Sequence, residues 1–124
     1  MTVDTKNFKV SEFACKHCGK NLIDQRVLNM AQELRDYLGV PVKVNSGYRC
    51  EVHNAKIGGV KNSKHIIGKA ADLACSLGSA KMFEAVKALR NQGKLQDMDY
   101  CIKYKTFIHI DCGGKRKNLY EVRS

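Results

Sequence analysis

The sequence has 124 residues, of which 44% are hydrophobic and 27% are charged, a composition typical of one globular domain, which we place over residues 1–124. Lys and Arg number 22 against 12 Asp and Glu, and the formal net charge of +10 excludes an acidic tail and favours an anionic partner such as nucleic acid, an anionic membrane or an anionic wall polymer. No apolar run reaches the roughly 20 residues of a membrane span, and residues 1–4 do not begin like a signal peptide. We therefore expect synthesis in the cytoplasm and no membrane insertion.

The first clear helix is predicted between Asp24 and Gly39. Asp24 is a suitable N-cap, and Gly39 is suited to end the helix. Between them four apolar residues recur at helical spacing and share one face: Val27, Ala31, Leu34 and Leu38. We expect that face to belong to the core.

A strand, a turn and a short helix are predicted next. Residues 41–45 alternate between apolar and polar side chains, as a short strand does, and residues 46–49 turn out of it. A short helix is expected over residues 50–57, because the glycines at 58–59 stop it.

The middle of the chain combines a polar loop with a buried strand and a second amphipathic helix. Residues 60–68 are polar and indicate a loop, whereas residues 69–75 are apolar apart from Asp72 and suit a buried strand. The helix is predicted from Ser79, as its N-cap, to Gln92.

The C-terminal part, residues 95–122, is predicted to form two or three antiparallel strands with a turn at residues 113–114. Helices and strands are intermixed along the chain, and the late strands follow one another. The expected fold class is therefore α+β, with a small antiparallel sheet flanked by helices.

Six cysteines leave three interpretations open: Cys15, Cys18, Cys50, Cys75, Cys101 and Cys112. An even number is compatible with three disulfides, but a chain of this length, made in the cytoplasm, is expected to keep free thiols. The third interpretation is a metal site, since residues 15–18 have a C-x-x-C spacing that resembles half of a zinc knuckle. No second C-x-x-C completes it.

The residues with the clearest chemistry are an acid in an apolar strand and two histidines. Asp72 is costly to bury unless a cation compensates it, and His65 on the preceding loop is a natural second ligand. Alternation in residues 106–111 places His109 and Asp111 on one strand face. Two imidazoles and one carboxylate suit zinc and leave a coordination position open. By spacing alone, packed or hydrogen-bonded histidines remain the alternative.

Several motifs occur in an order that resembles a known family, the zinc D-alanyl-D-alanine carboxypeptidase-like peptidases, which share a fold with the hedgehog signalling domain. The resemblance spans roughly residues 7–113 and depends above all on the later motifs. The matching segments are Phe8-Lys9-Val10-Ser11-Glu12-Phe13, Ser46-Gly47-Tyr48-Arg49-Cys50, His53-Asn54, Gly58-Gly59-Val60, S-x-H-x-x-G-x-A-A-D at 63–72 and Phe107-Ile108-His109-Ile110-Asp111.

The resemblance implies that His65, Asp72 and His109 are the zinc ligands. It also implies that Arg49 binds substrate, as a clamp for a carboxylate or as a partner for the tetrahedral oxyanion. Ser63 either contacts substrate or orients the loop. The other two histidines, at positions 17 and 53, match no ligand position of the family and are expected at the surface.

The catalytic base is where this chain departs from the family pattern. Many relatives have an acid three residues before the last histidine ligand, and Thr106 stands there instead. We take Asp111 as the candidate base, with a role in holding a ligand or Arg49 as its alternative. Asp99 and Glu121 also remain open.

The implied function is hydrolysis of an amide bond in peptidoglycan stem peptides or cross-links by a monomeric zinc peptidase, of the D-Ala-D-Ala carboxypeptidase or endopeptidase type. Such an enzyme acts on the cell wall once a phage or host route releases it, and its positive charge, with residues 115–117 contributing, aids contact with anionic wall polymers. The alternative is a non-catalytic zinc-containing binding domain of the same fold. Nucleic-acid binding is not expected, because no reading motif accompanies the charge.

Overall fold

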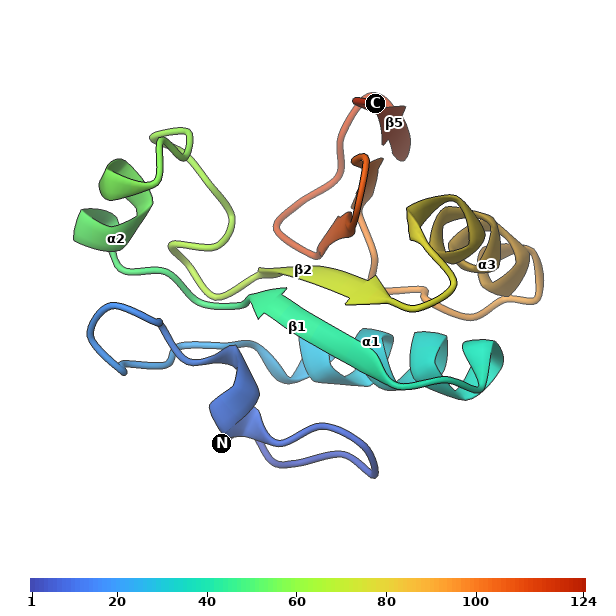
Figure 1. The fold of residues 1–124 in the computed structure, drawn as a ribbon, viewed down its shortest axis with the longest axis horizontal. Helices are drawn as coiled ribbons and strands as arrows, with labels where there is room; N and C mark the ends of the chain where they lie inside the picture. The colour runs from blue at the N-terminus through green and yellow to red at the C-terminus, as the bar shows by residue number, and fades with distance from the viewer.

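The computed structural model describes residues 1–124. It has a five-stranded sheet with helices packed against it (Figure 1). The α+β class is confirmed. None of the helices combines the length and the apolar character that a membrane-spanning segment needs. In chain order the elements are a short 3-10 helix η1 (Val10–Phe13), α1 (Gln25–Leu38), β1 (Val42–Ser46), α2 (Glu51–Lys56), β2 (Ala70–Cys75), α3 (Ser79–Asn91), β3 (Tyr100–Lys103), β4 (Ile108–Asp111) and β5 (Tyr120–Val122).

The sheet has the strand order β1-β2-β4-β3-β5 and is antiparallel except at one edge. There β5 runs parallel to β3, so of the two or three antiparallel strands expected in residues 95–122, β3 and β4 are antiparallel and the third strand is not. The reason is that β2 already pairs with the outer edge of β4. The last strand is therefore left with the free edge of β3, where it runs in the same direction as β3.

The ends of α1 lie where its capping residues predict, whereas the start of α3 does not. The Asp24 carboxylate accepts a hydrogen bond from the Arg26 backbone N–H at 2.9 Å, and Gly39 ends the helix with a φ of 70°. In α3 the N-cap is Gly78, and the prediction of Ser79 was wrong. The Ser79 hydroxyl instead donates to the carbonyl of Tyr104 at 2.6 Å, which ties the helix to the turn after β3.

The core lies between one face of the sheet and the helices α1 and α3, which pack against each other and against β2. Figure 1 shows both helices along the sheet, with α2 set apart from them. Strand alternation sends the residues before and after Asp72 and His109 into this core: Ala71, Leu73, Ile108 and Ile110. The side chains of Asp72 and His109 therefore lie on the opposite face of the sheet.

The N-terminal segment packs against the turn that follows β1. Phe8 and Phe13 are buried in the core, and the Phe13 carbonyl accepts a hydrogen bond from the Tyr48 N–H at 2.8 Å. This contact places the C-x-x-C segment beside the turn that carries Arg49.

Candidate metal centre

Strand register brings the first two candidate ligands together. In the antiparallel pair of β2 and β4, Asp72 stands directly opposite His109. His65 reaches them from the loop between α2 and β2. One ligand atom from each of the three side chains lies within 4.8 Å of the others, so the structure assembles the three residues that the sequence singles out.

The loop that carries His65 is held against the start of α1. Gly68 has a φ of +72°, and a Cβ atom there would lie 1.9 Å from the Leu22 carbonyl oxygen, so only glycine fits. The Gly68 carbonyl accepts from the Asp24 N–H at 2.8 Å, and Lys69 forms an ion pair with the Asp24 carboxylate at 2.5 Å. Gly68, the glycine of the S-x-H-x-x-G motif, thus allows the loop that carries His65 to pack closely against the start of α1.

The environment of His65 leaves one ring nitrogen free to bind a cation. Its Nδ1 lies 2.7 Å from the Gly47 carbonyl oxygen, which can only accept, so Nδ1 carries the proton and Nε2 has a lone pair. Nε2 is buried without a hydrogen-bond partner, although it lies 3.3 Å from Asp72 Oδ1. An imidazole lone pair and a carboxylate oxygen facing each other in a buried place require a cation between them. The donor set therefore fits a metal ion.

His109 is held between two carboxylates. Its Nδ1 lies 3.0 Å from Asp72 Oδ1, and its Nε2 lies 2.8 Å from Asp111 Oδ2. Asp111 is fully buried and contacts the ring nitrogen that points away from Asp72. When it accepts the Nε2 proton, Nδ1 is left facing the other two ligands. Such carboxylate–histidine pairs fix the ring orientation of metal ligands.

The pKa shifts of Asp72 and His109 indicate that this site attracts positive charge. Burial raises the pKa of Asp72, but its hydrogen bonds and attraction to His109 and His65 outweigh this and hold the pKa well below its usual range. Burial lowers the pKa of His109, and the bonds to Asp111 and Asp72 outweigh it, so that this pKa is raised above 6.5. Asp72 thus attracts positive charge from His109, His65 and Arg49 together.

Arg49 forms one wall of the site and is held by three side chains. Its guanidinium lies 3.3 Å from Asp72 Oδ2 and donates to Ser46 Oγ at 3.0 Å and to Asn54 Oδ1 at 2.9 Å. Burial lowers its pKa, although the negative charge of Asp72 opposes the shift. Ser46 and Asn54 lie in segments that match the family, but they were missed as site residues, because a serine or asparagine by itself gives no chemical signal in a sequence.

The cleft over the candidate ligands has a volume of about 390 Å³ and contains Arg49, Ser63 and all three ligands in its lining. Ser63 also accepts a hydrogen bond from the His65 N–H at 3.2 Å, which favours its role in orienting the loop. Arg123, from the C-terminal segment, lines the cleft too. No sequence signal pointed to it, since it follows β5 and lies far from every motif.

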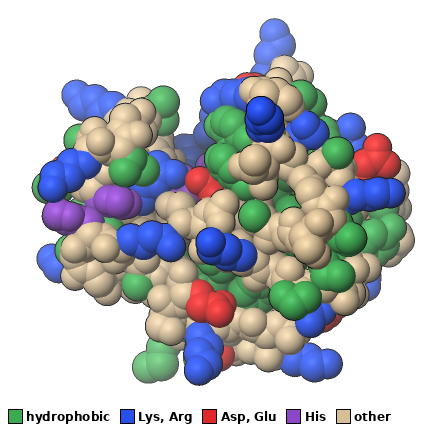
Figure 2. Space-filling view, in the orientation of Figure 1, with side chains coloured by type: hydrophobic (Ala, Val, Ile, Leu, Met, Phe, Trp, Pro, Cys, Tyr) green, Lys and Arg blue, Asp and Glu red, His purple; other side chains and the backbone are tan.

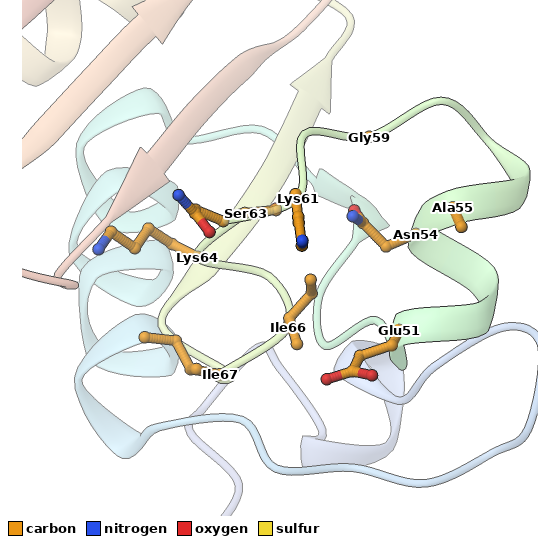
Figure 3. Close-up of a pocket in the computed structure, with 10 residues that line it drawn as sticks. Glu51, Asn54, Ala55, Gly59, Lys61, Ser63, Lys64, Ile66 and Ile67 are labelled. Atoms are coloured by element: carbon orange, nitrogen blue, oxygen red, sulfur yellow. The ribbon is translucent and has the colours of Figure 1, made fainter.

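A larger hollow of about 580 Å³ lies between α2 and the following loop but contains none of the candidate ligands. Figure 3 shows Glu51 and Asn54 reaching into it from α2, and Lys61 and Ile66 from the loop. Only Gly59 and Ser63 line both spaces. We therefore place the chemistry in the smaller cleft, where the titratable groups converge.

The acids considered as catalytic bases do not line the cleft. Asp111 lies behind His109, Asp99 accepts a hydrogen bond from the Gly114 N–H at 2.9 Å, and Glu121 binds Tyr100 and Arg123. Thr106 is exposed in the turn before β4. The position of Asp111 favours the second of its two expected roles, that of holding a ligand.

Comparison with known proteins agrees with this geometry. A model of the family described as Peptidase M15 matches residues 6–111. The chain is also 40% identical, over 63 residues, to the protein named zinc D-Ala-D-Ala carboxypeptidase from Streptomyces albus G. The matched segment makes up 50% of this chain and 24% of that relative, so the chain spans about a quarter of the relative's length.

Proposed function

Because the chain belongs to the peptidase M15 family, we propose that it is a zinc-dependent peptidase that hydrolyses an amide bond in peptidoglycan stem peptides or their cross-links. The observation that carries this proposal is the buried Nε2 of His65, which has no hydrogen-bond partner and faces a carboxylate oxygen. The similarity to a protein named zinc D-Ala-D-Ala carboxypeptidase supports the substrate class.

The proposed zinc ligands are Nε2 of His65, a carboxylate oxygen of Asp72 and Nδ1 of His109. The chemistry that zinc supplies when bound is Lewis acidity, which polarises a carbonyl group and makes water acidic enough to attack near neutral pH. Three protein ligands leave a position open for the reactants, as in catalytic rather than structural sites.

The chain's own residues orient the ligands and stabilise charge. The Gly47 carbonyl holds the His65 ring, and Asp111 holds the His109 ring. Arg49 presents a fixed positive charge at the cleft wall, and we assign to it the stabilisation of the negative charge that develops on the substrate's carbonyl oxygen. Its three hydrogen bonds restrict its movement, so that little reorganisation is needed during the reaction.

The lining of the cleft suits a peptide that carries a carboxylate. Arg49 and Arg123 both contribute guanidinium groups to it, and guanidinium binds carboxylate with two parallel hydrogen bonds. Tyr104 and Phe107 stack at a centroid distance of 4.6 Å and form an apolar wall beside them. Both carboxypeptidase and endopeptidase substrates from peptidoglycan stem peptides offer carboxylates of this kind.

The second candidate function is a non-catalytic zinc-containing binding domain of the same fold. One observation favours it: Asp72 is the only carboxylate that lines the cleft, and it is a proposed ligand. No acid is therefore in place to accept a proton from water, unless the substrate itself brings one.

The deciding experiment measures new amine groups released from purified peptidoglycan of several wall types. We expect the zinc-loaded protein to release them, a chelator to stop the release and added Zn²⁺ to restore it. His65→Ala should abolish release, whereas Lys61→Ala, in the same loop, should not. If no wall type shows chelator-sensitive release while the protein still binds zinc and peptidoglycan, the binding domain is correct and the enzyme proposal fails.

A further inference from the structure

Three of the six cysteines come together outside the lining of the cleft. The structure has all six as free thiols, and the sulfur atoms of Cys15, Cys18 and Cys50 lie within 4.8 Å of one another. We call these three residues the cysteine cluster. Cys15 and Cys18 lie on the loop after η1, and Cys50 immediately precedes α2. The sequence does not show this convergence, because 31 residues of chain, from 19 to 49, separate Cys18 from Cys50.

The backbone around the cysteine cluster directs N–H groups at sulfur. The Cys50 N–H donates to Cys15 Sγ at 3.4 Å, and the His53 N–H donates to Cys50 Sγ at 3.4 Å. The Gly19 N–H and the Cys15 carbonyl close the turn of the C-x-x-C segment at 2.8 Å. Donors aimed at sulfur stabilise the thiolate, which is the form that binds metal.

The charge balance of the cluster calls for a cation. Thiolates this close repel one another. A divalent cation removes the repulsion and engages all three sulfurs, whereas a disulfide would use two and leave the third unpaired.

His53 is the candidate for a fourth ligand, because its backbone N–H already contacts Cys50 Sγ. The imidazoles of His17 and His53 stack in parallel at a centroid distance of 6.1 Å, and Figure 2 shows histidine side chains adjoining at the left edge of the molecule. Cys50-Glu51-Val52-His53 repeats the spacing of Cys15-Lys16-His17-Cys18 with a histidine in the last place. A C-x-x-C paired with a C-x-x-H is a ligand set of closed, structural zinc sites.

We propose that Cys15, Cys18, Cys50 and His53 bind a second, structural Zn²⁺ ion, separate from the His65, Asp72 and His109 site. This proposal does not depend on the proposed function. Each thiol loses its proton on binding, and four protein ligands leave no position for a reactant.

Such an ion would fasten the N-terminal loop to the wall of the cleft. Cys50 directly follows Arg49, whose guanidinium contacts Asp72. The N-terminal segment also contacts this turn through the hydrogen bond from the Tyr48 N–H to the Phe13 carbonyl and through the hydrogen bond from the Cys50 N–H to Cys15 Sγ. Zinc bound at the cysteine cluster thus acts as a cross-link that keeps the backbone of Arg49 in place.

The test is a metal count on protein purified under reducing conditions and saturated with Zn²⁺. We expect two zinc ions per chain in the wild type, one in Cys18→Ser, one in His65→Ala and none in the double variant. Cys18 is exposed, so serine there removes little packing. Cys75→Ser is the matched control, because Cys75 is outside the cluster, and it should keep two ions. A wild type that holds a single ion, lost on His65→Ala, overturns the proposal.

Cobalt and thiol reagents give a second readout on protein with all its cysteines. Co²⁺ bound to His65→Ala should show thiolate-to-metal charge-transfer absorption, and a thiol-specific mercurial should release one zinc ion from the same variant. Absence of both signals, or a disulfide between two of the three cysteines under these conditions, contradicts the proposal. His53→Ala should weaken zinc binding at least about 10-fold, in the range of lost contacts to a metal site, whereas His17→Ala should not. The reverse result refutes the assignment of His53.

Discussion

Two regions of this molecule each bring three ligand-type side chains within 4.8 Å of one another, and they do so by different means. Asp72 and His109 meet because β2 and β4 pair in one register. The members of the cysteine cluster lie on a loop and on the turn before α2, and their exposure ranges from buried Cys15 to exposed Cys18. Two ligands of the first site lie on paired strands, whereas the cysteines lie on a loop and a turn outside the helices and strands.

The difference in ligand chemistry and in access separates their roles. The strand site, made up of His65, Asp72 and His109, combines two imidazoles with a carboxylate. It opens into a cleft of about 390 Å³, so it offers room for a reactant. The cysteine cluster offers soft sulfur ligands, and with His53 as the proposed fourth ligand it suits a closed site. The two clusters thus differ in ligand type and in access to a cleft, which is the basis for assigning them different roles.

The largest effect is expected when the carboxylate of the strand site is removed. Asp72→Asn keeps the shape of the side chain but takes away the charge that attracts the metal, so we expect hydrolysis to fall at least about 10³-fold, because a metal supplies several kcal/mol of stabilisation. Metal analysis should show the strand-site zinc lost and the cysteine-cluster zinc kept. Asp97→Asn, at an exposed position, is the control. Loss of both ions would contradict the independence of the two regions.

Arg49 adjoins both regions, so its replacement tests whether they are coupled. Arg49→Lys keeps the positive charge but loses the forked geometry that contacts Ser46, Asn54 and Asp72. We expect kcat to fall about 10²- to 10³-fold, as for other lost oxyanion partners, with both metal ions retained. Steady-state kinetics on a synthetic stem peptide measures it, with Arg35→Lys on α1 as control. An unchanged kcat in Arg49→Lys would show that the guanidinium of Arg49 takes no part in the reaction.

Replacing the residue that holds His109 should have a smaller effect. Asp111→Asn leaves the shape but weakens the bond to Nε2 of His109, so zinc affinity at the strand site should fall about 10- to 100-fold. A zinc titration against a competing chelator measures the change, and Cys18→Ser provides the background without the second site. If Asp111 only positions His109, the Asp111→Asn variant should have a near-normal kcat at saturating zinc. A kcat that stays low at saturating zinc would instead indicate that Asp111 is the catalytic base.

Asp24 links the start of α1 to the segment just before β2, because it caps α1 and forms an ion pair with Lys69. Asp24→Ala should lower the free energy of unfolding by about 1 kcal/mol through the lost cap, and Asp24→Asn, which keeps a capping side chain, by less. The bonds to Arg26 outweigh burial and hold the Asp24 pKa well below 3.8. The contribution of the charge is therefore present above pH 3.8 and is lost as the pH falls through the folded-state pKa.

Denaturant titrations at several pH values check this sign. The stability difference between the wild type and Asp24→Asn should narrow as the pH falls below about 4, near the unfolded pKa of an aspartate. A difference that widens on acidification would contradict it. Zinc at the cysteine cluster should be unaffected by either variant.

The smallest effect is expected at the outer edge of the cleft, at Arg123. About half of its side chain is exposed, so solvent and salt screen its charge. Arg123→Gln should raise KM for a carboxylate-bearing peptide about two- to fivefold, with kcat unchanged and the difference shrinking at high salt. Arg90→Gln on α3, outside the cleft, is the control variant. An effect as large as that at Arg49 would place Arg123 in the reaction itself.

The parts of the fold that could be predicted depend on local patterns. The caps of α1, the alternation in β4 and the apolar strand around Asp72 are each encoded within a few neighbouring residues. The parallel pairing of β5 could not be predicted, because it depends on β2 occupying the edge of β4. The hydroxyl of Ser79 likewise turned away from its helix because a distant turn offers it carbonyls.

The sequence by itself determined which residues have the chemistry of a metal site. His65, Asp72 and His109 stand out because an acid is costly in an apolar strand and because the motifs recur in a known order. Only the tertiary structure decided that Asp111 lies behind His109, that Arg123 reaches the cleft and that Cys50 joins Cys15 and Cys18. These depend on contacts between residues far apart in the chain, which strand pairing and loop packing create.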